Sequence, residues 1–590
     1  MTPVDIRDHT ISMSVPTEPS GTEHGRTGIR AAFWIIGLLS GLLLSYTTRH
    51  FINGDAVAYI EMGRALRTGN WWGLANLTYS PGYPILLGLA QAVLHTNPLN
   101  ELQYLRVVNF ICFVLGMIAC EALLTMVRRD HIRADFGTDR PLPFPIIRAL
   151  SYGMFLICAL LLVRVRLMTP DMLILAILLL AATAILWIKE DPNGYARFLV
   201  LGVILGVGYL VKSFMLPFSL AFFGVAALVG DSWKKAVPRV ATAVLMMLIV
   251  GAPLMGALSY RMHRFSYGEL GGLAYGLWIS GEGDPVNKPE VLSEKPRVAV
   301  YRYGIPCTQP SGHDICYWYV GFGPRLDVRA HFRVIVANVG KVLKQTPWLA
   351  LLVLWFLFLW KSGSFRWGRP GKPSLSTVLM IISVAGIGFF CLLNVEPRYV
   401  APFFFLGFVG LASGLCYSPE NPKALPRLKV ASAILMVFFV GLLVHSLVDQ
   451  SISGLGSLDR KLSYRDAYRE HVAVKDFLER HGTPRGSDVA VLGRRPPIYW
   501  ARMAGVTVVG EVTDPDEFLG VTRQERARAV HALSRAGIKA LVGKDARLGR
   551  LAGEGWARVP GTKDYYVLPL SADVSTKPRA TTDAKSISHR

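Results

Sequence analysis

The feature that most constrains the fold is a series of apolar runs spread along most of the chain. Of the 590 residues, 52% are hydrophobic, and the mean hydropathy of +0.37 is high for a soluble protein of this size. Many runs have about 17 to 24 residues, the length that a helix needs to cross a hydrocarbon core about 30 Å thick. We therefore predict a polytopic α-helical membrane protein with about 11 spans. The expected spans are 31–46, 104–127, 144–163, 172–188, 198–211, 214–229, 240–258, 348–360, 378–393, 400–416 and 430–448.

The charges between these runs predict the orientation of the chain. Short basic segments, such as 128–133 and 423–429, follow alternate runs. Cytoplasmic loops of membrane proteins carry an excess of Lys and Arg, so we place these segments and the N-terminus in the cytoplasm. This pattern accounts for much of the net charge of +22, which therefore does not indicate a nucleic-acid partner. The opposite, extracytoplasmic side receives five ionisable residues at helix ends: Asp55, Asp171, Lys212, Glu396 and Arg398.

Composition divides the chain into four parts. Residues 1–30 and 571–590 are polar, and we expect a disordered cytoplasmic tail and a disordered C-terminal tail. Residues 31–450 hold the spans, with extracytoplasmic loops at 48–103 and 260–345. The apolar run 84–94 is too short to cross a bilayer and is predicted to lie at its surface.

Residues 458–570 are globular in composition and form the fourth part. Strand patterns alternate with helix patterns here, which predicts a small extracytoplasmic α/β domain with a mostly parallel sheet. The expected strands are 488–493, 506–512, 538–544 and 565–570, and the expected helices are 496–504 and 522–536.

The segment 53–87 contains the most informative polar residue, Asp55. It directly follows the first span, at the boundary between water and lipid where chemistry on a lipid head group has to occur. One interpretation is that Asp55 only caps a short helix. The other is that it is a catalytic base, which takes the proton from an acceptor hydroxyl as that hydroxyl attacks a sugar.

Transfer of a sugar from a lipid phosphate also needs positive charge, because the phosphate is the leaving group. Lys212 and Arg398 are the predicted phosphate-binding cations. Tyr83 and Tyr399 are expected to donate hydrogen bonds to the same phosphate.

Two further acids, Asp171 and Glu396, are predicted to orient the cations or to bind sugar hydroxyls. Structural alternatives remain open for these residues. Asp171 follows Thr-Pro and is a plausible helix cap, Glu396 and Arg398 can form a simple ion pair, and Lys212 can snorkel from the end of its helix.

The cysteines predict one disulfide. Five of the seven lie in or beside apolar runs, whereas Cys307 and Cys316 lie in the polar loop that we place in an oxidising compartment. We predict that these two form a disulfide, with two free thiols as the alternative. No Cys/His pattern of a zinc site is present in the sequence. We expect no metal site and no cofactor, although a divalent metal is not excluded.

Five short motifs resemble those of the bacterial GT-C superfamily of membrane glycosyltransferases, the group that contains protein O-mannosyltransferases and the lipid A aminoarabinose transferase. They occur in the family's order and cover 31–447. They are Asp55 with Tyr59, Gly63, Leu66, Gly69 and Trp71; Ser80-Pro81-Gly82-Tyr83-Pro84; Thr169-Pro170-Asp171; Gly206 to Lys212; and Glu396-Pro397-Arg398-Tyr399. One departure is that many relatives have Asp-Glu where this chain has Asp55-Ala56.

The resemblance implies a GT-C-like fold, a polyprenyl-phosphate sugar donor and an inverting transfer that needs no metal. It implies that Tyr59 helps to bind or orient the substrate. It further implies a location in the bacterial cytoplasmic membrane, with a cell-envelope glycan, lipid (such as lipid A) or protein as the acceptor. Two other classes remain as alternatives: a transporter or flippase, and a non-catalytic envelope-assembly protein.

Overall fold

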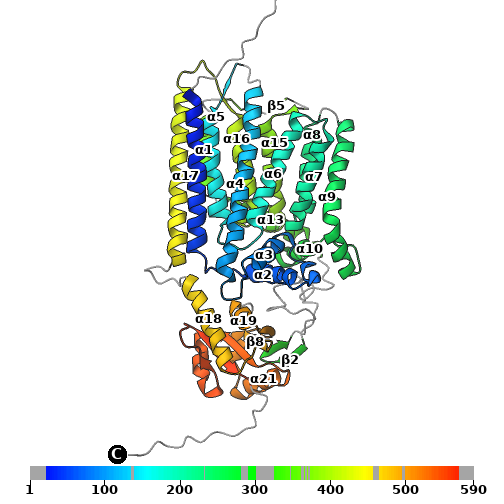
Figure 1. Cartoon of the computed structure of the whole chain (residues 1–590), viewed down its shortest axis with the longest axis vertical. Coiled ribbons are helices and arrows are strands. Elements are labelled where there is room, and N and C mark those ends of the chain that lie inside the picture. The colour runs from blue at the N-terminus through cyan, green and yellow to red at the C-terminus, as the bar shows by residue number, and fades with distance from the viewer. Residues whose placement is uncertain are drawn as a thin grey trace, which may run out of the picture.

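The computed structural model describes residues 21–134, 138–230, 233–280, 290–300, 325–345, 347–360, 364–365, 368–369, 372–455, 464–493 and 498–570. Figure 1 shows long helices that lie side by side in one bundle, with a smaller group of strands and short helices next to one end of that bundle. We call residues 464–570 the C-terminal sheet region.

Each predicted span coincides with a helical segment of the bundle. Six of them, within the described ranges, are long and apolar enough to cross a membrane: Thr27–Thr47, Glu101–Arg133, Phe144–Val163, Asp171–Glu190, Lys234–Met262 and Ala424–Leu455. The others are shorter or less apolar, so the count of about 11 stays a prediction. The bundle helices are α1 (Gly21–Thr47), α4 (Glu101–Arg133), α5 (Phe144–Leu156) continued by the π-helical η2 (Ile157–Val163), α6 (Asp171–Glu190), α7 (Tyr195–Val211), α8 (Met215–Leu228), α9 (Trp233–Met262), α14 (Pro347–Trp360), α15 (Leu375–Cys391), α16 (Pro397–Gly414) and α17 (Ala424–Leu455).

The first helix starts earlier than the sequence suggested. Residues 21–30 belong to α1, so the expected unstructured tail to residue 30 is too long. An apolar run that has already formed a helix can extend it into polar residues at little cost, because propagation is far easier than nucleation. Residues 1–20 and 571–590, which complete the two predicted tails, lie outside the described part of the chain.

Helix α6 lies at the centre of the bundle. Of its apolar segment, 78% is buried, the highest share among the six long helices. It packs against α4 on one side and α7 on another. Asp171 is its first residue, so the fold brings this carboxylate to the middle of one end of the bundle.

Two short helices and a 3-10 turn cover this end: α2 (Gly54–Arg67), η1 (Trp71–Leu74) and α3 (Gly82–Val93) (Figure 1). α2 ends where Gly69 adopts a positive φ of 74°, a conformation that glycine adopts without strain. α2 and α3 cross at two glycines, and a Cβ on Gly63 would lie 2.9 Å from the backbone nitrogen of Gly88. The predicted short helix at 84–94 is therefore present, and it is fixed against α2 by a close backbone contact.

The predicted loop 260–345 contains more regular structure than its polar sequence suggested. Its described parts form α10 (Leu270–Tyr275), the π-helical η3 (Gly276–Ser280), β2 (Glu290–Glu294), β3 (Arg297–Val300) and α13 (Val328–Gln345). α13 packs on α15, where the Asn338 amide donates to the carbonyls of Cys391 and Leu393 at 3.1 and 3.2 Å. Cys307 and Cys316, the predicted disulfide, lie outside the described residues.

A seven-stranded sheet organises the C-terminal region, in the order β11-β12-β10-β8-β9-β3-β2. The four predicted strands are present as β8 (Asp488–Leu492), β9 (Thr507–Val512), β10 (Ala540–Lys544) and β12 (Tyr565–Pro569), and β11 (Ala557–Arg558) is added. The helices are α18 (Tyr464–Arg480), α19 (Tyr499–Ala504), α20 (Pro515–Gly520), α21 (Arg523–Arg535) and the 3-10 segment η4 (Ala546–Glu554).

The prediction of a mostly parallel sheet was wrong. Only β10-β8 and β8-β9 pair in parallel, whereas the other four pairings are antiparallel. The β2–β3 hairpin comes from between two bundle helices and adds two antiparallel strands to the edge at β9. This pairing joins residues more than 200 positions apart, so the local sequence pattern carried no signal for it.

At the opposite end of the bundle, five very short strands link the helix ends. They are β1 (Arg140–Pro141), β4 (Ser364–Phe365), β5 (Gly368–Arg369), β6 (Lys372–Pro373) and β7 (Leu415–Tyr417). β7 pairs with β1 and β4, and β5 pairs with β6.

Candidate active site

The five ionisable residues predicted on one side of the membrane come together at the end of the bundle that faces the C-terminal sheet region. Arg398, in the first turn of α16, is at the centre. Its guanidinium lies 3.5 Å from Asp171 Oδ2, 3.6 Å from Asp55 Oδ2 and 3.2 Å from Glu396 Oε2. Lys212, at the end of α7, reaches Asp171 Oδ1 with its Nζ at 2.5 Å. Residues up to 343 positions apart in sequence therefore form one network.

Asp171 is the buried anchor of this network, with 3% of its surface exposed. Its Oδ2 also accepts a hydrogen bond from the Thr169 hydroxyl at 2.8 Å. A buried carboxylate is costly unless it is paired and hydrogen-bonded, and here two cations and a hydroxyl meet that need. Asp171 is not the helix cap, because Pro170 occupies that position. Its geometry fits the predicted role of orienting the two cations.

Tyr399 holds the two cations from the side. The Nζ of Lys212 lies 4.0 Å from the centre of its ring, and the Arg398 guanidinium lies 5.1 Å from it. Arg398 Nη2 also donates to the Tyr399 hydroxyl at 3.3 Å. Cations over an aromatic face are stabilised by its electron density. Lys212 is therefore held within the site and does not snorkel to the surface.

Asp55 has a different environment from Asp171, because 42% of its side chain is exposed. It lies in the first turn of α2, whose N-cap is Asn53, so it is not the capping residue. Its Oδ1 accepts a hydrogen bond from the Tyr79 hydroxyl at 3.4 Å. A solvent-accessible carboxylate can take a proton from a hydroxyl that comes within hydrogen-bond reach.

Tyr83 and Tyr59 lie in the packed core next to the charge network. The Tyr83 side chain is fully buried, and its hydroxyl donates to the side-chain oxygen of Asn109. Tyr59 is also buried, with its ring 4.8 Å from Tyr79 and 5.5 Å from Tyr83. The rings of Tyr59, Tyr79 and Tyr83 pack together next to Asp55, to which the Tyr79 hydroxyl donates. Because the Tyr83 hydroxyl is bonded to Asn109 in this structure, its role as a phosphate ligand stays a prediction.

Sequence reasoning missed residues that shape the site from behind. Asn109 Nδ2, on α4, donates to the carbonyl of Val165 at 2.8 Å and also to that of Leu167. Arg106, one turn earlier and buried, donates to the carbonyl of Arg166. Both residues thus fix the connection that leads to Thr169 and Asp171. A buried Arg and Asn in an apolar helix are the only sequence signal for this role.

The two cations are balanced by three carboxylates in this arrangement. Glu396 and Asp55 are both partly exposed, whereas Asp171 is buried. The ion pair of Glu396 with Arg398 that the sequence suggested as an alternative is present, as one contact of a larger network. An incoming phosphate can compete with the exposed carboxylates for Arg398 and Lys212 while Asp171 keeps both cations in place. Within the described residues, no group of three or more His, Cys, Asp or Glu side chains has the arrangement of a metal site.

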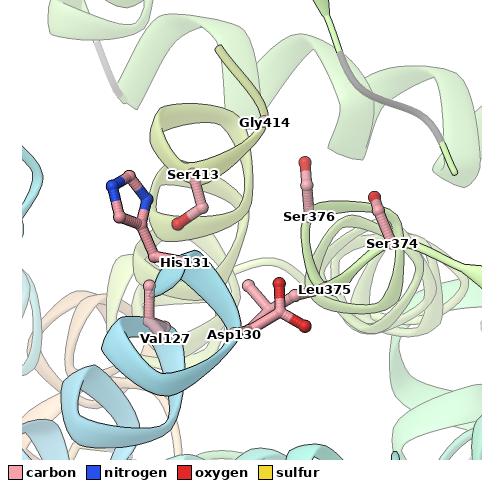
Figure 2. A pocket seen from close by; sticks show the side chains of 8 residues that line it. All are labelled: Val127, Asp130, His131, Ser374, Leu375, Ser376, Ser413 and Gly414. Carbon is pink, nitrogen blue, oxygen red and sulfur yellow. The ribbon is translucent and has the colours of Figure 1, made fainter. Parts of the chain in front are cut away.

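A small cavity at the other end of the bundle is separate from this site. Figure 2 shows the side chains that line it, which come from α4, α15 and α16 and include Asp130, His131 and Ser376. Asp130 is paired with Lys189 at 2.9 Å. Asp171 and Lys189 lie 18 residues apart on α6, so the cavity lies roughly 27 Å from the site along the helix axis, at 1.5 Å per residue.

No protein-family model matches the chain, and no curated protein sequence matches it. Solved structures do match. The apo crystal structure of ArnT, the lipid A aminoarabinose transferase, from Cupriavidus metallidurans superposes with a TM-score of 0.55 at 14% identity, over 94% of this chain and 100% of that one. The chain has the ArnT fold.

The second ArnT structure, bound to undecaprenyl phosphate, gives a TM-score of 0.52 at 13% identity over the same shares of the two chains. An oligosaccharyltransferase from Archaeoglobus fulgidus, solved with zinc and sulfate, superposes with a TM-score of 0.37 at 12% identity over 88% of this chain and 69% of that one. ArnT is a GT-C enzyme, so the resemblance to the GT-C superfamily that the five motifs predicted is confirmed at the level of the fold.

Proposed function

We propose that this protein is a membrane glycosyltransferase that moves a sugar from a polyprenyl-phosphate donor to a hydroxyl group of a cell-envelope acceptor. The observation that carries the proposal is the meeting of Lys212 and Arg398 on one buried acid, Asp171, next to the exposed Asp55. ArnT, which shares the fold, has been solved with undecaprenyl phosphate bound. That ligand has the chemistry that two clustered cations at the end of a membrane bundle would attract.

The proposed reaction is a direct displacement at the anomeric carbon. The acceptor oxygen attacks that carbon while Asp55 takes the hydroxyl proton. The bond between the anomeric carbon and the phosphate oxygen breaks, and its electron pair leaves with the polyprenyl phosphate. Lys212 and Arg398 stabilise the charge that develops on the leaving phosphate. Attack from the face opposite the leaving group inverts the anomeric configuration.

The cations also bear on metal dependence. Because Lys212 and Arg398 supply the positive charge that a divalent ion would otherwise provide, we propose that transfer needs no metal or other cofactor. Transfer should persist in excess EDTA. Loss of activity in EDTA that Mg²⁺ or Mn²⁺ restores would contradict this part of the proposal.

We further propose that the end of the bundle with the site faces the extracytoplasmic side of the bacterial cytoplasmic membrane. The opposite end carries a group of basic residues, among them Arg129, Arg133 and Lys189, which pair with acids there. An excess of Lys and Arg near short loops favours a cytoplasmic location for that end of the bundle. In this orientation the C-terminal sheet region is an extracytoplasmic domain. The helical segments of the bundle, about 11 in number, cross or enter the bilayer.

The direct test is donor use by the purified full-length protein in nanodiscs. A panel of radiolabelled polyprenyl-phosphate sugars is supplied with candidate glycan, lipid A and protein acceptors, and products are separated by chromatography. One donor should be consumed with release of polyprenyl phosphate. Failure to bind or use any donor, combined with movement of a substrate across the bilayer, would favour a transporter instead.

A further inference from the structure

We infer that Arg502, in the C-terminal sheet region, is a positioning residue for the site at the end of the bundle. The inference rests on the proposed function, because it concerns the helix that carries Asp55. Arg502 lies on α19, the short helix on the side of the sheet region that faces the bundle (Figure 1). It joins two bundle elements through buried charge.

The main contact is a bidentate ion pair with Glu101, the first residue of α4. Arg502 Nε lies 2.5 Å from Glu101 Oε1, and Nη2 lies 2.9 Å from Oε2. Only 4% of Arg502 and 2% of Glu101 are exposed. Tyr499, also on α19, donates to Glu101 Oε1 at 2.9 Å and to the carbonyl of Pro98 at 3.0 Å. The contact is therefore a fully desolvated and geometrically specific attachment.

The third nitrogen of the same guanidinium reaches the Asp55 helix. Arg502 Nη1 lies 3.5 Å from Glu61 Oε1, and the Glu61 side chain is largely buried. Glu61 lies six residues after Asp55 on α2, which is about 9 Å along the helix axis. One cation of the C-terminal sheet region thus sits between two buried carboxylates, one on α2 and one on α4.

Loss of this cation would leave Glu61 and Glu101 close together without their shared counter-charge. Breaking a buried ion pair by removing one partner is strongly destabilising, because the remaining charge is uncompensated. The strain can be relieved if α2 shifts together with α3, to which it is fixed at Gly63 and Gly88. Displacement of α2 would misplace Asp55, whereas Lys212, Arg398 and Asp171 lie on other helices.

The experiment compares Arg502→Met with Arg526→Met in the full-length protein in nanodiscs. Arg526 is the matched control, because it also forms a bidentate pair, with Glu554 at 3.0 and 2.8 Å, but entirely within the C-terminal sheet region. Hydrogen–deuterium exchange of α2 is measured first. Amide exchange around Glu61 should rise about tenfold or more in Arg502→Met, as expected when a buried pair is broken, and should not change in Arg526→Met.

Kinetics give the second readout. In Arg502→Met, kcat for transfer should fall about tenfold while the Kd for polyprenyl phosphate changes less than about twofold, because misplacing a catalytic group lowers the rate and leaves the separate phosphate cations intact. Unchanged α2 exchange in a folded Arg502→Met protein, or an equal increase in Arg526→Met, would overturn the inference. If Arg502→Met does not fold, Glu61→Gln decides, since it removes only the α2 branch and should still raise α2 exchange. If α2 exchange rises as expected but the wild type transfers no sugar, the positioning role stands and the proposed function fails.

Discussion

Removal of the Arg398 guanidinium tests whether the charge network is the phosphate site. In Arg398→Ala, Asp171 keeps Lys212 at 2.5 Å and Thr169 at 2.8 Å, so its buried charge stays compensated and the protein should fold. The network loses its contacts at 3.2 to 3.6 Å with Glu396, Asp171 and Asp55. The leaving phosphate then has one cation in place of two.

Loss of one preorganised electrostatic stabiliser typically lowers kcat by about 10²- to 10³-fold, which corresponds to about 2.7 to 4 kcal/mol of transition-state stabilisation. We expect this loss in Arg398→Ala, together with weaker binding of polyprenyl phosphate. Arg398→Lys should recover only part of the rate, because an ammonium group cannot reproduce the planar fork of the guanidinium.

The assay is single-turnover transfer in nanodiscs with saturating donor, alongside donor binding. Arg197→Ala is the control, because Arg197 is similarly shielded from solvent and pairs with Asp191 near the other end of α7. It should transfer sugar at close to the wild-type rate. A folded Arg398→Ala protein with wild-type kcat and wild-type donor affinity would refute the assignment of the phosphate to this network.

Gly63→Ala places a Cβ 2.9 Å from the Gly88 nitrogen and should lower the free energy of unfolding by about 1 to 3 kcal/mol through overpacking. Gly54→Ala is the control, because the space around Gly54 is open and the substitution should cost little. Thermal unfolding compares the two variants, and equal stabilities would contradict the close contact between α2 and α3. Burial, with a smaller effect from Lys544, lowers the pKa of His471 to about 3. The unfolded chain protonates His471 near pH 6.5 and the folded chain does not. The C-terminal sheet region should therefore lose about 1.4 kcal/mol of unfolding free energy per pH unit as the pH falls from about 6.5 towards 3. In His471→Phe, hydrogen exchange should show a weaker dependence of this free energy on pH, and an unchanged dependence would contradict the prediction. Alkaline phosphatase fused to the C-terminus should be active in bacteria, because we place this end outside the cytoplasm. An inactive phosphatase fusion, together with a fluorescent C-terminal fluorescent-protein fusion, would place the C-terminus in the cytoplasm.

The helical bundle could be predicted from the sequence because long apolar runs are strong local signals. The strands β8, β9, β10 and β12 were found for the same reason, since each is a short buried run bounded by turn residues. The β2–β3 hairpin was not found, because its place in the sheet depends on pairing with β9 across a long stretch of chain.

The candidate site could be predicted only in part. Charges at helix ends correctly indicated that Asp55, Asp171, Lys212 and Arg398 share one end of the bundle. The direction of a side chain is not encoded in such a pattern, and Tyr83 turned out to face the core.

Contacts between residues that are distant in sequence could not be predicted either. The ion pair of Glu101 with Arg502 joins residues 401 positions apart. Each residue alone looks like an ordinary surface charge at the start of a helix or within a basic segment. Only the three-dimensional contact reveals that both are buried.

The central claim is that Asp55 is the base of a sugar transfer, and one variant tests it most directly. Asp55→Asn keeps the size of the side chain and its ability to accept a hydrogen bond from Tyr79, but it cannot take up the acceptor proton. The measurement is product formation from the preferred polyprenyl-phosphate sugar in nanodiscs, with donor binding and thermal unfolding measured in parallel. We expect donor affinity and stability close to those of the wild type, with transfer reduced by about 10²- to 10⁴-fold, the range that general base catalysis contributes. Transfer at the wild-type rate by a well-folded Asp55→Asn protein would contradict the account.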